Sequence, residues 1–118
     1  MPVRLFPRTP FLAGHDVAAT RECVLDYFHE TADRYEQLFE MLACDEAYFS
    51  KPIALRHPLI FYFGHTATFF INKLQLAGLL KTRINPRFES IFAVGVDEMS
   101  WDDLDEANYD WPSVAEVE

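Results

Sequence analysis

The feature that most constrains the fold is the apolar stretch HPLIFYFGHTATFFINKLQLAGLL, residues 57–80. Pro58 suits the first turn of a helix, where its missing N–H costs no hydrogen bond. Lys81 and Arg83 suit the negative end of the helix dipole, so we predict a helix from Pro58 to about Leu80. Its first half is apolar nearly all round and must be buried on most sides. The fold therefore has to supply several elements that pack around this helix.

A second helix is predicted from about Arg21 to Cys44, with Thr20 as its N-cap. Residues 1–19 before it form an extended arm that contains three prolines. Apolar and aromatic residues recur along this helix every three or four positions, and acidic residues occupy the opposite face. The apolar set is Val24, Phe28, Thr31, Tyr35, Leu38 and Leu42. One amphipathic helix of this kind covers a single side of the 57–80 helix, so an all-α bundle with further helices is expected.

The end of the chain carries a start signal for another helix. Ser113 and Glu116 form a capping box, S-x-x-E, directly after Pro112, and the sequence stops at Glu118. One helical turn does not offset the cost of helix nucleation. We therefore expect an antiparallel helix bundle truncated to about its first half. A long loop over residues 82–112 would follow the 57–80 helix, with one short turn over Trp101–Glu106.

The distribution of charge argues against a nucleic-acid partner. The net charge is −9, and all ten Lys and Arg residues precede Asp97. Residues Asp97–Glu118 hold nine acidic side chains and no basic one, which is the opposite of a basic nucleic-acid footprint. Two explanations stay open for this acidic segment: a solvated surface, or a segment that docks on a basic partner.

The chain has the composition of a packed domain that does not cross a membrane. Half of its 118 residues are apolar and 11 are Phe, which suits one domain with a modest core. The apolar run Leu59–Phe63 is broken by Gly64 and His65, and the N-terminus lacks the apolar core of a signal peptide. Cys23 and Cys44 lie near opposite ends of one predicted helix, so we expect free thiols and a cytoplasmic protein.

His65 is the candidate functional residue. On a helix it shares a face with Tyr62, Thr68 and Asn72, which together form a thin polar seam between aromatic rings. A buried imidazole needs a polar partner, because an unsatisfied buried polar group costs roughly 1–3 kcal/mol. That partner is either a hydrogen-bonding group or a metal ion, and the residues alone leave both open. Gly64 lowers helix propensity and suits a place where another helix or a ligand comes close.

Two segments resemble a known family. HPLIFYFGHTATFFINKL and RINPRFESIFAVGVDEMSWDDLDEANYDWPSVAEV are similar to the N-terminal DinB-like domain of the ovothiol-pathway 5-histidylcysteine sulfoxide synthases, relatives of the ergothioneine-pathway enzymes. The likeness runs from about Thr20 to Val117. The stretch GVDEMSWDDLDEANYDWP is its most specific part. Residues 20–118 would then be a partial DinB-like domain.

The resemblance implies a non-haem Fe(II) oxidoreductase that joins the thiol of cysteine to the imidazole of histidine, using O2. Three histidines hold the iron in that family, and His65 matches the one on the second bundle helix. The other two form a pair one turn apart on a later helix, and His15, His29 and His57 do not match them. The chain alone is therefore expected to be inactive.

Tyr62 and Asn72 lie on the same helix face as His65, and we predict that they orient the metal-bound imidazole. The alternative function is non-catalytic: a stand-alone DinB-like binding or assembly module. Because one amphipathic helix cannot cover the 57–80 helix, we also expect the chain to self-associate.

Overall fold

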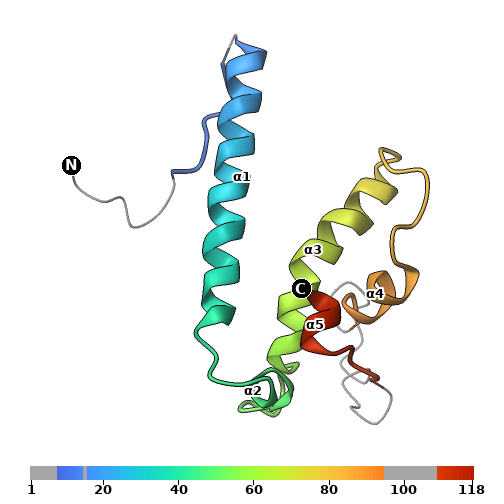
Figure 1. Ribbon diagram of the computed structural model, residues 1–118. Helices are drawn as coiled ribbons and strands as arrows, with labels where there is room; N and C mark the ends of the chain where they lie inside the picture. The colour runs from blue at the N-terminus through green and yellow to red at the C-terminus, as the bar shows by residue number, and fades with distance from the viewer. Residues whose placement is uncertain (1–7, 15, 95–108) are drawn as a thin grey trace, which may run out of the picture. The chain divides into compact units, whose positions relative to one another are not determined.

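The computed structural model describes residues 8–14, 16–94 and 109–118, and these contain five helices and no strand. The prediction of an all-α protein is therefore confirmed for the described residues. The chain divides into two compact units (Figure 1), one ending at Met41 and the other beginning at Leu42. None of the helices in the described part of the chain has the length and apolarity needed to cross a membrane.

The first unit is dominated by α1, Val17–Glu40. Its N-cap is Asp16, whose carboxylate accepts a hydrogen bond from the Ala19 amide at 3.0 Å. The prediction of Thr20 as N-cap was wrong, because Thr20 lies in the first turn and donates its hydroxyl to the Asp16 carbonyl. The helix thus begins before the predicted end of the arm at residue 19, and it ends at Glu40 rather than Cys44.

The central helix of the second unit is α3, Leu59–Leu76. Pro58 caps its N-terminus, close to the predicted start. The predicted end at Leu80 was wrong, because Gly78 adopts a left-handed backbone conformation with φ of 75°. Only glycine enters that region without a steric penalty, and the Leu79 amide then bonds back to the Leu74 carbonyl at 2.9 Å.

Three short helices accompany α3: α2, Glu46–Phe49; α4, Pro86–Ile91; and α5, Val114–Val117. The predicted capping box is confirmed at α5, where Ser113 and Glu116 each bond the other's backbone N–H. Helices α2 and α4 were not predicted: α2 lies between the two predicted long helices, and α4 lies in the loop predicted over residues 82–112. The predicted turn at Trp101–Glu106 lies outside the described residues.

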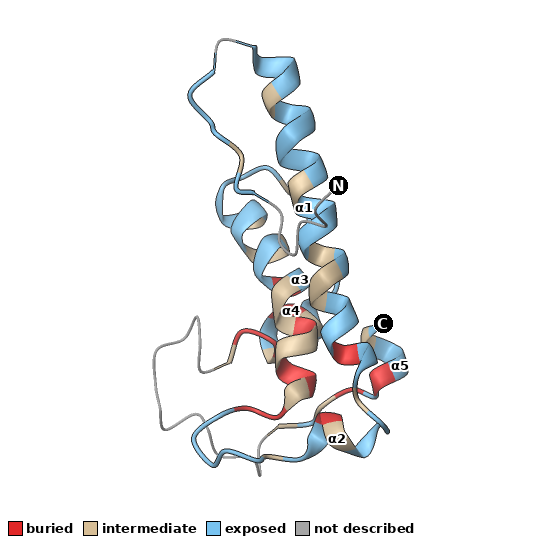
Figure 2. Ribbon diagram, turned by 90° about the vertical axis from the view of Figure 1, so that its left-hand side faces the viewer, coloured by how far each residue is buried: buried red, intermediate tan, exposed pale blue. Residues whose placement is uncertain are grey.

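The core of the second unit forms around the first half of α3. Helices α2, α4 and α5 all pack against α3. Ile60 and Phe61 on α3 are fully buried, as is Phe92 just after α4. Figure 2 shows buried residues, in red, on α3 and on the other helices of this unit. The prediction that the first half of this helix would be buried is therefore confirmed, and short elements close to it in the sequence provide much of the cover.

Candidate functional site

The candidate site is a column of aromatic rings along the first half of α3. The Phe61 ring contacts two imidazoles, with its centroid 4.1 Å from that of His57 and 5.0 Å from that of His65. The Phe61 and His65 rings are stacked, with an interplanar angle of 15°. His57 and Phe61 are buried, and His65 is half-buried. The predicted placement of His65 on a mostly buried helix face therefore agrees with the structure.

Both imidazoles bind the backbone of one short segment, residues 92–94. The His65 Nδ1 lies 2.5 Å from the Phe92 carbonyl oxygen, and the His57 Nε2 lies 2.9 Å from the Val94 carbonyl oxygen. A carbonyl can only accept a hydrogen bond, so each of these ring nitrogens carries the proton. In its neutral form His65 is then protonated at Nδ1, and its Nε2 keeps a lone pair that can accept a proton or bind a metal.

Gly64 makes the contact between α3 and this segment possible. A Cβ atom at position 64 would lie 2.5 Å from the Phe92 ring, well inside van der Waals contact. The Phe92 ring is in turn stacked on Trp111, with centroids 6.2 Å apart. The expectation of a close approach at Gly64 is confirmed, and the group that approaches is the Phe92 side chain. This packing brings the Phe92 carbonyl within reach of His65.

Asn72 has a structural partner of its own. Its side-chain amide donates to the Glu89 carbonyl oxygen at 3.0 Å, and Gln75 donates to the Glu89 carboxylate at 2.6 Å. Glu89 is buried and also accepts a hydrogen bond from the Asn85 amide at 2.7 Å. Asn72 thus fastens α4 to α3. The ring of Tyr62 packs edge-on against the Phe61 ring of the aromatic column, with ring centroids 5.3 Å apart.

The described residues fit one ligand of a metal site, not a complete site. A metal-binding histidine usually donates its other ring N–H to a carbonyl or a carboxylate, and His65 does so with the Phe92 carbonyl. However, no group of three His, Cys, Asp or Glu side chains with metal-ligand geometry occurs within 8–14, 16–94 and 109–118. His29 lies in the first unit, where its ring meets Phe28 edge-on, and His15 lies outside the described residues.

The described part of the acidic segment has a basic partner within the chain. Arg87 on α4 lies 3.5 Å from the Glu116 carboxylate and 3.9 Å from that of Asp110. The Ser113 backbone N–H and hydroxyl, with a smaller effect from Arg87, lower the pKa of Glu116 below its ordinary 4.5. These groups are exposed, so the ion pairs are screened by solvent. They join α4 to the residues around α5.

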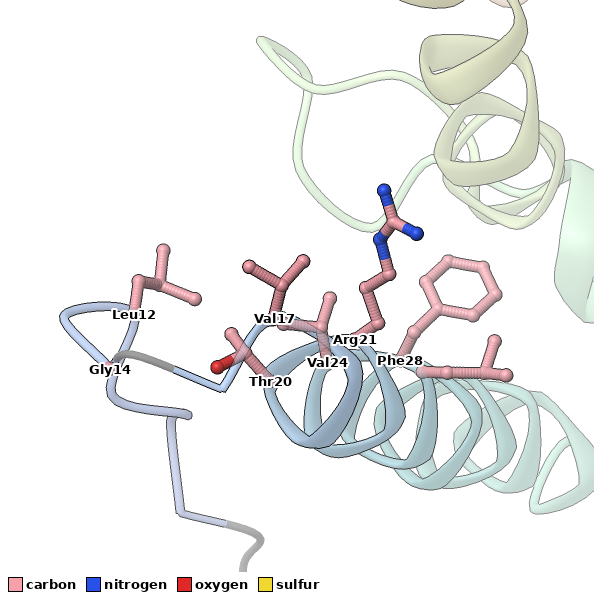
Figure 3. Close-up of a pocket in the computed structure, with 8 residues that line it drawn as sticks. Leu12, Gly14, Val17, Thr20, Arg21, Val24 and Phe28 are labelled. Atoms are coloured by element: carbon pink, nitrogen blue, oxygen red, sulfur yellow. The ribbon is translucent and has the colours of Figure 1, made fainter.

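A separate surface hollow lies in the first unit, between the N-terminal segment and α1 (Figure 3). Its volume is about 500 Å³, and Leu12, Val17, Val24 and Phe28 supply much of its apolar lining. Among the described residues that line it, Arg21 is charged. Sequence reasoning did not find this hollow, because it depends on how the arm folds back along α1. It contains none of the predicted site residues.

In comparisons with known proteins, the chain matches no protein-family model and none of the curated proteins.

Proposed function

We propose that this chain is part of a DinB-like helix bundle in a non-haem Fe(II)-dependent sulfoxide synthase of the ovothiol type. In this proposal the chain holds about the first half of the bundle, and His65 supplies one of three iron-binding imidazoles. The enzyme would join cysteine to histidine with O2 as the oxidant. Iron would supply the activation of O2, the general role of an open metal site.

The observation that carries the proposal is the state of the His65 imidazole. Its Nδ1–H is engaged by the Phe92 carbonyl, so Nε2 is the nitrogen available to a ligand. The stacked Phe61 ring fixes the plane of the imidazole. A fixed tautomer and a fixed ring plane are what a bundle helix must provide when it presents a metal ligand. Within the chain, His65 would orient the metal, while the aromatic rings beside it would limit the access of water.

The direct test is His65→Ala in the longest open reading frame that contains residues 1–118. We expect loss of 5-histidylcysteine sulfoxide formation from histidine, cysteine and O2, and a large loss of bound iron. His29→Ala on α1 is the matched control and should keep both. The same reading frame should encode an H-x3-H pair on a later helix. Normal turnover and iron content in His65→Ala would refute the ligand assignment.

A second candidate is a non-catalytic binding or assembly module. Apolar side chains remain exposed on both long helices, among them Val24 and Phe28 on α1 and Phe69 and Phe70 on α3. Exposed apolar surface of this kind favours association with other helices or with a second copy.

Anaerobic Fe(II) titration of residues 1–118, compared with titration of a protein that also contains the later helices, separates the two candidates. The synthase proposal predicts no stoichiometric iron, because a single imidazole does not hold Fe(II) tightly. It also predicts that iron binding appears when the later helices are included in the protein. The module predicts no iron in either case, with self-association visible in sedimentation velocity.

A further inference from the structure

His57 is a buried imidazole outside the ligand set that the proposed function uses. It precedes α3, contacts the Phe61 ring, and donates to the Val94 carbonyl. His57 and His65, which are eight residues apart, therefore form hydrogen bonds with the carbonyl groups of Val94 and Phe92, which are two residues apart. The residue between those carbonyls, Ala93, is buried. This arrangement fixes the segment at two points.

We infer that His57 is a positioning residue, which holds segment 92–94 so that the Phe92 carbonyl keeps His65 protonated at Nδ1. The inference deepens the proposed function and rests on it only for the use of the bare His65 Nε2. Neutral histidine in water favours the tautomer protonated at Nε2, the opposite of the one that the Phe92 carbonyl selects. The protein must therefore hold this carbonyl in place against that preference.

Several contacts hold the Phe92 carbonyl. The Phe92 ring packs against Gly64 and stacks on Trp111, which fixes the side chain. The Phe92 amide donates to the Phe88 carbonyl at 3.0 Å, which fixes the backbone on the α4 side. On the other side the described segment is held through the His57–Val94 hydrogen bond. The Ala93 N–H, which belongs to the same peptide unit as the Phe92 carbonyl, also donates to the Ser90 carbonyl at 3.2 Å. Loss of the His57–Val94 bond leaves Val94 less constrained, so that the Phe92 carbonyl turns away from His65 more easily.

The test reads the tautomer directly in the metal-free chain of 118 residues. Two-bond 1H–15N correlation spectra of histidine-labelled protein at mildly alkaline pH report which ring nitrogen is protonated. We expect the 15N chemical shift of His65 Nδ1 in the range of a protonated ring nitrogen, and that of Nε2 in the range of a non-protonated one. In His57→Phe, which keeps an aromatic ring on Phe61 and lacks the donor, both resonances should move toward the average of the two tautomers. His57→Gln keeps a donor and should restore much of the wild-type pattern.

The control variant is His29→Phe on α1, which should leave the His65 resonances unchanged. The inference is overturned if wild-type His65 is averaged or protonated at Nε2, or if His57→Phe leaves its tautomer unchanged. Equal loss of the pattern in His57→Phe and His57→Gln would also overturn it, because the donor would then be irrelevant. These outcomes are independent of sulfoxide formation and iron binding. A correct tautomer with an active His65→Ala enzyme would refute the proposed function alone.

Discussion

The two halves of α3 have similar apolar sequences and different surroundings. In the first half, Ile60 and Phe61 are fully buried. In the second half, Phe69 and Phe70 remain 38% and 43% exposed. The core of the second unit is covered by α2, α5 and the Phe92 ring. On the second half of α3, by contrast, Asn72 and Gln75 form hydrogen bonds with Glu89. An apolar sequence thus predicts that a helix surface needs to be buried, while the packing of the described elements determines which part of it is buried.

This difference also separates stability from association. A buried ring contributes to the free energy of unfolding, because its removal leaves a cavity and loses apolar burial. An exposed ring contributes little to folding and remains available to another apolar surface. The first half of α3 is therefore expected to determine the stability of the second unit, and the second half its tendency to associate.

The largest effect is expected from removing the buried Phe61 ring, which contacts both histidines. Phe61→Ala should lower the free energy of unfolding by about 3–5 kcal/mol, the usual cost of emptying a core Phe position. Phe70→Ala on the second half is the matched control and should cost less than about 1 kcal/mol, since surface substitutions rarely cost more. Urea unfolding can be followed by tryptophan fluorescence, because the ring centroids of Trp111 and Phe61 lie 5.9 Å apart and unfolding separates them. Equal losses in the two variants would contradict the contrast between the halves.

A smaller loss is expected from Gly64→Ala. The added methyl would lie 2.5 Å from the Phe92 ring, and such overpacking typically costs about 1–3 kcal/mol. The gain in helix propensity, about 1 kcal/mol, offsets part of that cost. The net effect on the free energy of unfolding should still be destabilising. In a Phe92→Leu background the same substitution should cost less, and a double-mutant cycle measures the difference. Additive effects would show that the methyl and the ring do not meet.

The fold was predictable where a helix has a local sequence signal, such as an apolar stretch or a capping motif. The apolar stretch and Pro58 located α3, and the capping box located α5. Helix α4 has a local signal too: Asn85 caps it and Pro86 occupies its first turn. That signal was overlooked because α4 is too short to show a helical period. The end of α3 could have been placed at Gly78, a residue type common just after helices.

The candidate site was predictable only in part. Helical spacing placed His65 among aromatic rings and showed that its imidazole needs a partner. It could not identify the partner, because the Phe92 carbonyl is 27 residues away and every residue offers a carbonyl. The position of His57 beside Phe61 was missed for a related reason, since His57 precedes the helix and its place depends on the turn into α3. Asn72 was predicted to orient the His65 imidazole, whereas in the structure its side-chain amide donates to the carbonyl of Glu89, which belongs to the unpredicted α4.

The smallest expected effect concerns α5, one of the elements that pack on α3. Hydrogen bonds from the Ser113 backbone N–H and hydroxyl stabilise the charged form of Glu116 and lower its pKa below 4.5. A carboxyl group whose folded pKa is depressed contributes stability above its unfolded pKa, and loses it as the pH falls through the folded pKa. Packing of α5 should therefore weaken only in acid, starting below about pH 4.5. NMR chemical shifts of the Ser113 and Val114 amides against pH measure this directly, and their midpoint should lie below 4.5. Glu116→Gln should remove the midpoint, whereas Glu118→Gln should leave it in place. A midpoint at or above the ordinary glutamate value would show that the capping box does not stabilise the charged form of Glu116 and does not help to hold α5 against α3.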